Sequence, residues 1–261
     1  MELNKIFLLD VFLFLDNKVE DETIDLAIVD PPYNINQESW DSFNSEEEYW
    51  NFTFKWLDKL ILKMKKNGSL YLFNNAYNSA IILNYLVKKG LVFQNWIIWH
   101  KKDGFSTTKK KFVNNQETIL FFTINKDYYF NPEIIRVPYE SKLRIEHARK
   151  KGILKNGKRW YPNKNGKLCS DVWDFASARH FNKVNGKLQK YFHPTSKPEK
   201  MIERIILASS QENNLVLDLF SGSGTTSYVA KKNKRNFIGC ENDNSYFNLA
   251  NERLGRIDVA R

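Results

Sequence analysis

An apolar run that leads into a glycine-rich turn and then a helix, at residues 215–232, constrains the fold most strongly. Residues 215–219 predict a buried strand, and 225–232 predict a helix that starts directly after the turn. A second apolar run follows at 237–240 and ends at Glu241. A strand, a helix and another strand in this order predict two parallel strands joined by a crossover helix.

The glycine turn and Glu241 together indicate a site for a nucleoside-containing cofactor. A turn built from Gly222 and Gly224 lets a ligand approach the backbone closely, and the helix that follows supplies N–H donors. An acid at the end of the next strand accepts hydrogen bonds from ribose hydroxyls. Ser227 follows Thr226, so the third glycine of the dinucleotide fingerprint is absent. This favours S-adenosylmethionine, which has no pyrophosphate, over NAD. The alternative for Glu241 is a solvated carboxylate at a strand end.

A third apolar run, at 24–29, leads into Asp30 and the sequence Pro31-Pro32-Tyr33. Proline has no N–H and a fixed φ, so a Pro-Pro pair ends the hydrogen bonding of the strand and leaves a rigid, extended turn. A carboxylate beside a freed carbonyl offers two acceptors, which match the two donors of an exocyclic amino group. Tyr33 adds a flat face for stacking on a planar base. The alternative is that Asp30 only begins a turn and Tyr33 packs in the core.

The remaining pattern predicts an α/β protein with a doubly wound, mostly parallel sheet covered by helices on both faces, and one antiparallel strand near the edge. Periodicity weakens between 131 and 190, where Gly, Lys, Asn and Trp alternate. We therefore expect one domain in two halves, 1–130 and 191–261, with 131–190 as an inserted region of irregular structure and short strands. Further strands are predicted at 4–9, 69–73, 91–99 and 117–124, and further helices at 11–15, 45–66, 77–89, 198–208 and 246–254.

The positive charge is concentrated in one part of the chain. Residues 101–190 contain 21 Lys and Arg against 8 Asp and Glu, whereas the rest of the 261 residues contain 19 against 22. A basic middle on a nearly neutral scaffold predicts a surface for phosphate groups, and Trp160 and Tyr161 within it could stack on bases. The alternative is a solvated, lysine-rich surface. The candidate residues for such contacts with a nucleic-acid backbone are Lys109, Lys110, Lys111, Arg144, Lys158 and Arg159.

Cys169 and Cys240 are the only cysteines, so the sequence predicts neither a disulfide framework nor a cysteine metal cluster. This usage favours the reducing cytoplasm. No apolar run reaches the length needed to span a membrane, and Asp10 interrupts the apolar start at 6–15. We expect a cytoplasmic protein that uses no metal and no membrane.

The order of these motifs resembles that of the β class of amino-group DNA methyltransferases. In that class the Asp-Pro-Pro-Tyr motif precedes the cofactor motif, and target recognition lies between them, where this chain has its basic region. The segment His193-Pro-Thr-Ser-Lys-Pro also matches the class. Blocks such as Gln116-Glu-Thr-Ile-Leu-Phe-Phe and Arg235-Asn-Phe-Ile-Gly-Cys, in a shared order over nearly the whole chain, resemble the adenine-N6 enzymes of the MboII type.

The resemblance implies a Rossmann-like methyltransferase fold with permuted motif order. It implies transfer of a methyl group from S-adenosylmethionine to N6 of an adenine rotated out of duplex DNA. Asp30 and the Pro31 carbonyl would each accept one N6–H, and Tyr33 would stack on the adenine; the catalytic set is Asp30, Pro31, Pro32 and Tyr33. The implied cofactor contacts are Asp10, Asp30, His193, Thr195, Phe220, Ser221, Gly222, Gly224 and Glu241. Ser196 departs from the class, which usually has glutamine there.

The resemblance also implies the modification enzyme of a restriction-modification system with an asymmetric, GAAGA-like target. Family relatives often dimerise, so a homodimer is one expectation, although an asymmetric target does not require it. Three alternatives stay open. RNA or protein amide methyltransferases generally have Asn in place of Asp30, and cytosine-N4 enzymes usually have Ser there. The third, a recognition subunit without catalysis, is opposed by the intact Asp-Pro-Pro-Tyr and glycine turns.

Overall fold

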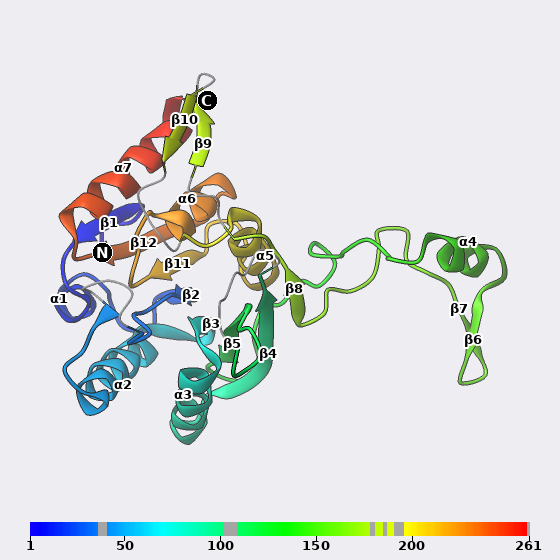
Figure 1. The fold of residues 1–261 in the computed structure, drawn as a ribbon, viewed down its shortest axis with the longest axis horizontal. Helices are drawn as coiled ribbons and strands as arrows, with labels where there is room; N and C mark the ends of the chain where they lie inside the picture. The colour runs from blue at the N-terminus through cyan, green and yellow to red at the C-terminus, as the bar shows by residue number, and fades with distance from the viewer. Residues whose placement is uncertain (36–40, 102–108, 178–180, 185–186, 191–195, 260–261) are drawn as a thin grey trace.

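The computed structural model describes residues 1–35, 41–101, 109–177, 181–184, 187–190 and 196–259. Its centre is an eight-stranded sheet with helices on both faces (Figure 1). The strands of this sheet are β1 (Lys5–Leu8), β2 (Ile24–Val29), β3 (Met64–Asn74), β4 (Val92–His100), β5 (Gln116–Thr123), β8 (Val172–Asp174), β11 (Leu215–Asp218) and β12 (Asn236–Glu241). The flanking helices are α1 (Val11–Asn17), α2 (Glu46–Lys63), α3 (Ala76–Lys88), α5 (Glu199–Ser209), α6 (Thr225–Lys232) and α7 (Asn244–Val259).

The strands lie in the order β1-β12-β11-β2-β3-β5-β4-β8. Neighbours are parallel except at β5, which runs antiparallel to both β3 and β4. Crossover helices between parallel strands follow from the alternation of strand and helix along the chain. The predicted doubly wound, mostly parallel α/β fold is therefore confirmed.

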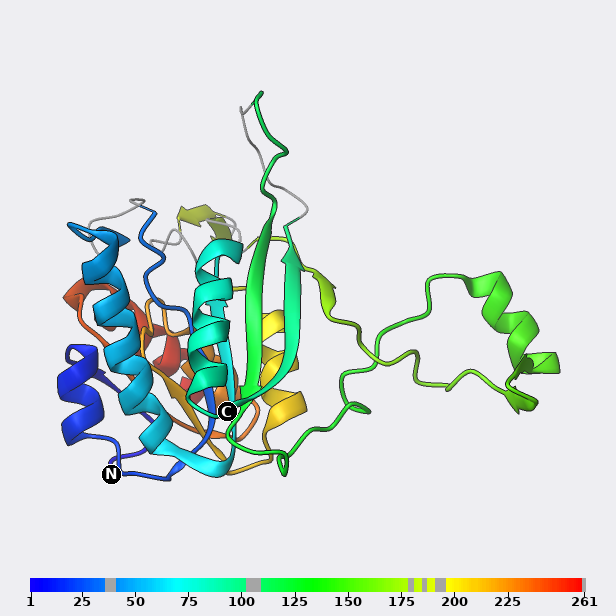
Figure 2. The same ribbon diagram turned by 90° about the horizontal axis from the view of Figure 1, so that it is seen from below.

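Each face of the sheet has its own apolar core, because successive residues of a strand point to opposite sides. In β2, Ala27 and Val29 pack in one core with residues of α1, α2 and α3. Leu26 and Ile28 pack in the other core with residues of α5, α6 and α7. Figure 2 shows these helical layers on opposite sides of the sheet. Within the described ranges, no helix is long and apolar enough to cross a membrane.

All strands except β5 end at the same edge of the sheet. Asn74 at the end of β3 pairs with Thr118 near the start of β5, and His100 at the end of β4 pairs with Gln116. Because β11 lies between β12 and β2, this edge also brings together the segments that follow β2, β11 and β12. Ligands of open parallel sheets bind at this edge, where strand order reverses.

The predicted helix at 45–66 is three residues too long, since α2 ends at Lys63 and Met64 already belongs to β3. Met64 pairs with Ile24, is only 2% exposed, and is followed by a bulge before Ser69 pairs with Leu26. Gly68 lies in this bulge, within β3. A Cβ on Gly68 would lie 2.9 Å from the Lys65 carbonyl oxygen, so the close backbone approach explains the glycine.

The chain between β5 and β8 leaves the body as an arm, drawn in green in Figures 1 and 2. The arm carries α4 (Lys142–Lys151) and a hairpin of β6 (Ile153–Lys155) and β7 (Lys158–Trp160). Val137 and Lys167 pair at its base. No apolar stripe predicts α4, because Ala148 is its only buried residue. Beyond β8, which extends the main sheet beside β4, β9 (Phe181–Val184) and β10 (Lys187–Lys190) form a separate hairpin.

Candidate active site

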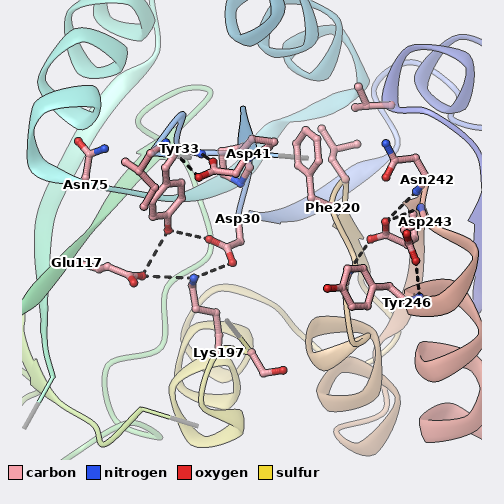
Figure 3. Close-up of a pocket in the computed structure, with 18 of the residues that line it drawn as sticks. Asp30, Tyr33, Asp41, Asn75, Glu117, Lys197, Phe220, Asn242, Asp243 and Tyr246 are labelled. Atoms are coloured by element: carbon pink, nitrogen blue, oxygen red, sulfur yellow. Dashed lines mark hydrogen bonds and ion pairs between the residues drawn. The ribbon is translucent and has the colours of Figure 1, made fainter. Parts of the chain in front are cut away.

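A cavity of about 620 Å³ opens at the carboxyl edge of the sheet. Its walls come from the segments after β1, β2, β11 and β12 and from both ends of the β4–β5 connection. Figure 3 shows the Asp30 and Tyr33 side chains on one side of this cavity and Phe220, Asp243 and Tyr246 on the other. The Asp-Pro-Pro-Tyr motif and the glycine turn, which lie far apart in the sequence, therefore share one cavity.

Eight of the predicted catalytic and cofactor residues line the cavity: Asp10, Asp30, Pro31, Pro32, Tyr33, Phe220, Gly222 and Glu241. Ser221 and Gly224 belong to the same glycine turn but are not among the lining residues. Gly224 has a φ of 70°, which a side chain would strain, and an added Cβ would lie 2.8 Å from that of Ala250. His193 and Thr195 lie outside the described residues.

Both oxygens of the Asp30 carboxylate have partners. The Tyr33 hydroxyl donates to Oδ1 at 2.8 Å, and the Lys197 ammonium lies 2.7 Å from Oδ2 (Figure 3). Lys197 also lies 3.3 Å from the Glu117 carboxylate, and its Nζ stands 5.6 Å from the centre of the Tyr33 ring. Lys101 pairs with Glu117 from the other side. Two carboxylates and two ammonium groups therefore balance each other inside the cavity.

Burial and these charges shift the pKa values of the cluster. Burial raises the pKa of Asp30 in spite of the Lys197 charge beside it. Burial alone would lower the pKa of Lys197, but Asp30 and Glu117 raise it above its usual value, so Lys197 stays charged. Burial opposes the ionised form of Glu117 too, yet Lys197 and Lys101 bring its pKa below the usual range. Burial, reinforced by both carboxylates, raises the pKa of the Tyr33 hydroxyl, which therefore remains a neutral donor.

The Asp41 carboxylate holds the turn after Asp30 in place. Asp41 is 2% exposed, and its Oδ1 accepts the backbone N–H groups of Tyr33 at 2.5 Å and Asn34 at 2.8 Å. From the helices, the Tyr49 hydroxyl donates to the Pro32 carbonyl, and the Asn78 amide donates to the Tyr33 carbonyl. The turn is thus fixed by groups that a local sequence pattern does not reveal.

Glu241 connects the two strands of the predicted cofactor site. Its Oε2 accepts the Gly222 N–H at 2.7 Å, and its Oε1 accepts those of Asn242 and Asp243, both at 2.9 Å. Burial raises the pKa of Glu241 although these donors oppose the shift. Phe220, on the same side, packs edge-on against Trp56, with ring centres 5.6 Å apart. This side of the cavity combines an oriented carboxylate with an apolar ring.

Lys197, Glu117 and Asp41 were not among the predicted site residues. The signal for Lys197 was present, since it lies in the segment 193–198 that matches the β class. Its neighbour Ser196 hydrogen-bonds Ser223 of the glycine turn, with 2.8 Å between the two oxygens. The neighbouring residues 196 and 197 therefore contact the glycine turn and the Asp30 carboxylate, respectively.

The predicted DNA-binding residues form two separate exposed groups. Lys109, Lys110 and Lys111 lie in the connection between β4 and β5, whose two ends line the cavity. Arg144, Lys158 and Arg159 lie on α4 and β7 of the arm and are not among the residues that line the cavity. Figure 2 shows the arm extending away from the sheet. Among the described residues, no group of three or more His, Cys, Asp or Glu side chains could hold a metal ion.

An open parallel sheet with an Asp-Pro-Pro-Tyr turn beside a glycine turn is the architecture of Rossmann-like methyltransferases that act on amino groups. The chain belongs to the N6/N4 DNA methylase family, whose model, described as DNA methylase, matches residues 24–252. It is therefore a DNA methyltransferase, as the order of its motifs predicts.

Individual relatives agree with this assignment. The chain is 54% identical to Type II methyltransferase M1.MboII of Moraxella bovis over 259 residues, 99% of each chain, which confirms the resemblance to the MboII type. It is 34% identical to DNA adenine methyltransferase YhdJ of Escherichia coli strain K12, over 93% of this chain and 79% of that one.

Two solved structures share the fold. The M1.HpyAVI–SAM complex has a TM-score of 0.64 at 24% identity and covers 96% of this chain and 98% of its own. The cytosine-N4-specific PvuII DNA methyltransferase has a TM-score of 0.70 at 16% identity and covers 95% of this chain and 85% of its own. At these identities, the likeness concerns the fold alone.

Proposed function

We propose that this protein transfers a methyl group from S-adenosylmethionine to N6 of a flipped-out adenine in double-stranded DNA, as the modification enzyme of a type II restriction-modification system. The observation that carries the proposal is the position of Asp30, in one cavity with the glycine turn that follows β11. An amino group and a methyl donor can meet there without a further protein group between them. The relatives M1.MboII and YhdJ support a type II DNA enzyme and adenine as its base.

The side of the cavity formed by β11 and β12 fits S-adenosylmethionine. Glu241 is oriented by three backbone donors, which leaves lone pairs for ribose hydroxyls, and Phe220 offers an apolar face to the adenine ring. Asp10 lines the same cavity and caps α1 through Oδ1 alone. His193 and Thr195 are retained as proposed contacts. When bound, the cofactor supplies an electrophilic methyl group on a sulfonium centre.

Asp30 and the Pro31 carbonyl make the adenine N6 nitrogen more nucleophilic, because each accepts a hydrogen bond from one of its two N–H groups. The N6 lone pair is normally delocalised into the ring, and these two acceptors favour a tetrahedral nitrogen whose lone pair faces the methyl group. The Tyr49 hydroxyl and the Asn78 amide occupy the next two carbonyls of the turn. Within the part of the chain that the structure describes, no group donates to the Pro31 carbonyl, so it is available to N6.

The arriving base displaces the Tyr33 hydroxyl from Asp30. The Tyr33 hydroxyl and the Lys197 ammonium each hold one Asp30 oxygen, and the more weakly held of the two gives way to N6–H. The Tyr33 bond is neutral, whereas Lys197 forms an ion pair that Glu117 also fixes. After this exchange the Tyr33 ring stacks on the adenine, and stacking of this kind contributes about 1–3 kcal/mol per base.

The exposed cations supply contacts to DNA phosphates. We assign Lys109, Lys110 and Lys111 to the DNA beside the cavity, and Arg144, Lys158 and Arg159 to DNA that the arm reaches. In this assignment 131–190 is the target-recognition region, and 1–130 together with 191–261 form one catalytic domain. The proposed target is asymmetric and GAAGA-like, and one copy of the chain is sufficient to bind it.

The test is methyl transfer from labelled S-adenosylmethionine to duplexes that differ in one adenine, followed by nucleoside analysis. One duplex contains GAAGA, and matched duplexes change each adenine of it in turn. N6-methyladenine at one position of one duplex is the expected product. Asp30→Ala should abolish the product while the cofactor still binds, with reduced affinity.

Other products would contradict the proposal in distinct ways. Label in N4-methylcytosine would show a different base, and label only in RNA would show a different nucleic acid. Normal turnover by the Asp30→Ala variant would remove Asp30 from the chemistry. Cofactor binding without transfer to any duplex would indicate a recognition subunit.

A further inference from the structure

Phe112 is 99% exposed, although it is the type of residue that proteins usually bury. It follows Lys109, Lys110 and Lys111 directly, and the next residue, Val113, is 43% exposed. An apolar ring held in water costs free energy and suggests a role in contact with a partner. Its three lysine neighbours favour a polyanion as that partner.

The position of Phe112 relates it to the cavity. The connection that carries it begins after β4 and ends at β5, and Lys101, Asn114 and Gln116 from its two ends line the cavity. The Lys101 N–H donates to the Asn115 carbonyl at 2.7 Å and closes the base of the connection. Figure 2 shows residues 109–115 projecting past the sheet edge where the parallel strands end. Phe112 is thus carried by a segment whose two ends line the cavity.

A nucleotide that leaves the duplex creates a gap in the base stack. Breaking the stacking and pairing of the target is the main cost of rotating it into a pocket. Proteins that distort DNA often offset such a cost by inserting an apolar side chain between base steps. An exposed phenylalanine next to cations that grip phosphates has the chemistry for this role.

We propose that Phe112 enters the base stack of duplex DNA at the position that the target adenine leaves. The proposal rests on the proposed function, because it requires a base in the Asp30 cavity. Lys109, Lys110 and Lys111 hold the flanking phosphates, and Phe112 stacks on the bases that remain. Phe112 acts on the position of the base and not on the methyl transfer itself.

The experiment compares the wild-type protein with Phe112→Ala and Phe112→Leu. Leu62→Ala, which removes another exposed apolar side chain (62% exposed) on α2, is the matched control. Base rotation is measured by the fluorescence of 2-aminopurine at the target position, and kcat/KM by methyl transfer. Both are repeated with a duplex that has a mismatched base opposite the target adenine, because a mismatch lowers the cost of rotation. Cofactor binding is measured for all variants.

Phe112→Ala should reduce kcat/KM on the paired duplex by about ten- to a hundredfold and should abolish the 2-aminopurine signal. The mismatched duplex should restore most of the activity, cofactor binding should be unchanged, and Phe112→Leu should be intermediate. Equal losses on both duplexes, or no loss at all, would overturn the proposal. If the wild-type protein methylates no adenine, the proposed function fails instead, so the two failures are distinguishable.

Discussion

Lys197 sets the charge of the cavity. Its ammonium lies between the Asp30 and Glu117 carboxylates and favours the ionised form of both. A buried pair of carboxylates without a cation would share a proton, as like charges in a low dielectric do. The side chain is 8% exposed, so water screens these interactions little. Lys197 is therefore a positioning residue for Asp30.

Replacing Lys197 with methionine should shift the acid limb of the pH profile of kcat/KM to higher pH. Lys197 lowers the pKa of Asp30 electrostatically, so its removal raises that pKa further. More Asp30 is then protonated at neutral pH and unable to accept N6–H. Lys197→Arg keeps the charge and should leave the limb near its wild-type position. An unshifted profile in the methionine variant would show that Lys197 has only a structural role.

Asp218 should make the folded protein less stable as pH rises. Burial raises the pKa of Asp218 from 3.8 to about 7, so the folded state binds its proton more tightly than the unfolded state. The contribution of Asp218 to the free energy of unfolding is therefore fully present below about pH 4 and is lost as pH rises towards 7. Asp218→Asn should be equally stable at pH 4 and more stable at pH 8, by up to about 4 kcal/mol. Urea unfolding at both pH values measures this, with the exposed Asp127→Asn as control.

The site residues that the sequence reveals are those that share a local motif. Asp30, Tyr33 and Phe220 come shortly after a strand and Glu241 ends one, so their types and positions along the chain already suggest chemistry. Lys197 contacts both Asp30 and Glu117, and these contacts depend on how β2, β5 and the segment before α5 come together. Lys197 lies in the segment 193–198 that matches the β class, but a single sequence carries no periodic or spacing signal that joins Glu117 to this group.

At the scale of elements, the connection between β4 and β5 links the cavity to the proposed DNA contacts of Lys109, Lys110 and Lys111. Neutralising Lys109, Lys110 and Lys111 to glutamine should weaken DNA binding and flatten its dependence on salt. The logarithmic slope should decrease by about 0.9 for each lysine that contacts a phosphate. Titrations of DNA binding at several salt concentrations measure the slope. Lys88→Gln, which neutralises an exposed lysine on α3 outside this connection, is the control. An unchanged slope would remove this connection from the interface.

Strong periodicity made most elements predictable, and the exceptions have physical causes. The strands at 24–29 and 215–219 were found because apolar runs of strand length end at polar turns. The end of α2 was misplaced because Met64 leaves the helix to pair with Ile24, a tertiary contact that overrides helix propensity. The helix α4 was missed because it buries only Ala148 and therefore has no apolar face to predict it.

At the scale of the whole molecule, the arm is a separable unit. The two segments that connect the arm to the rest of the protein form an antiparallel β-bridge at Val137 and Lys167. Replacing 138–166 with Asn-Gly, a preferred two-residue hairpin turn, should leave the sheet intact. The shortened protein should bind S-adenosylmethionine with unchanged affinity and lose preference for its target sequence. Isothermal titration and methylation of mixed duplexes measure the two properties; lost cofactor binding would show that the arm supports the catalytic domain.

The strand order has a consequence for synthesis of the protein. The first strand, β1, pairs with β12, and β2 lies beside β11, so the earliest strands find partners near the end of the chain. The ribosome releases the Asp30 turn early and residues 219–241 late. A growing chain therefore holds the proposed base-binding half of the site long before the proposed methyl-donor half exists. On the proposed function, a chain that stops before residues 219–241 should have no methyltransferase activity.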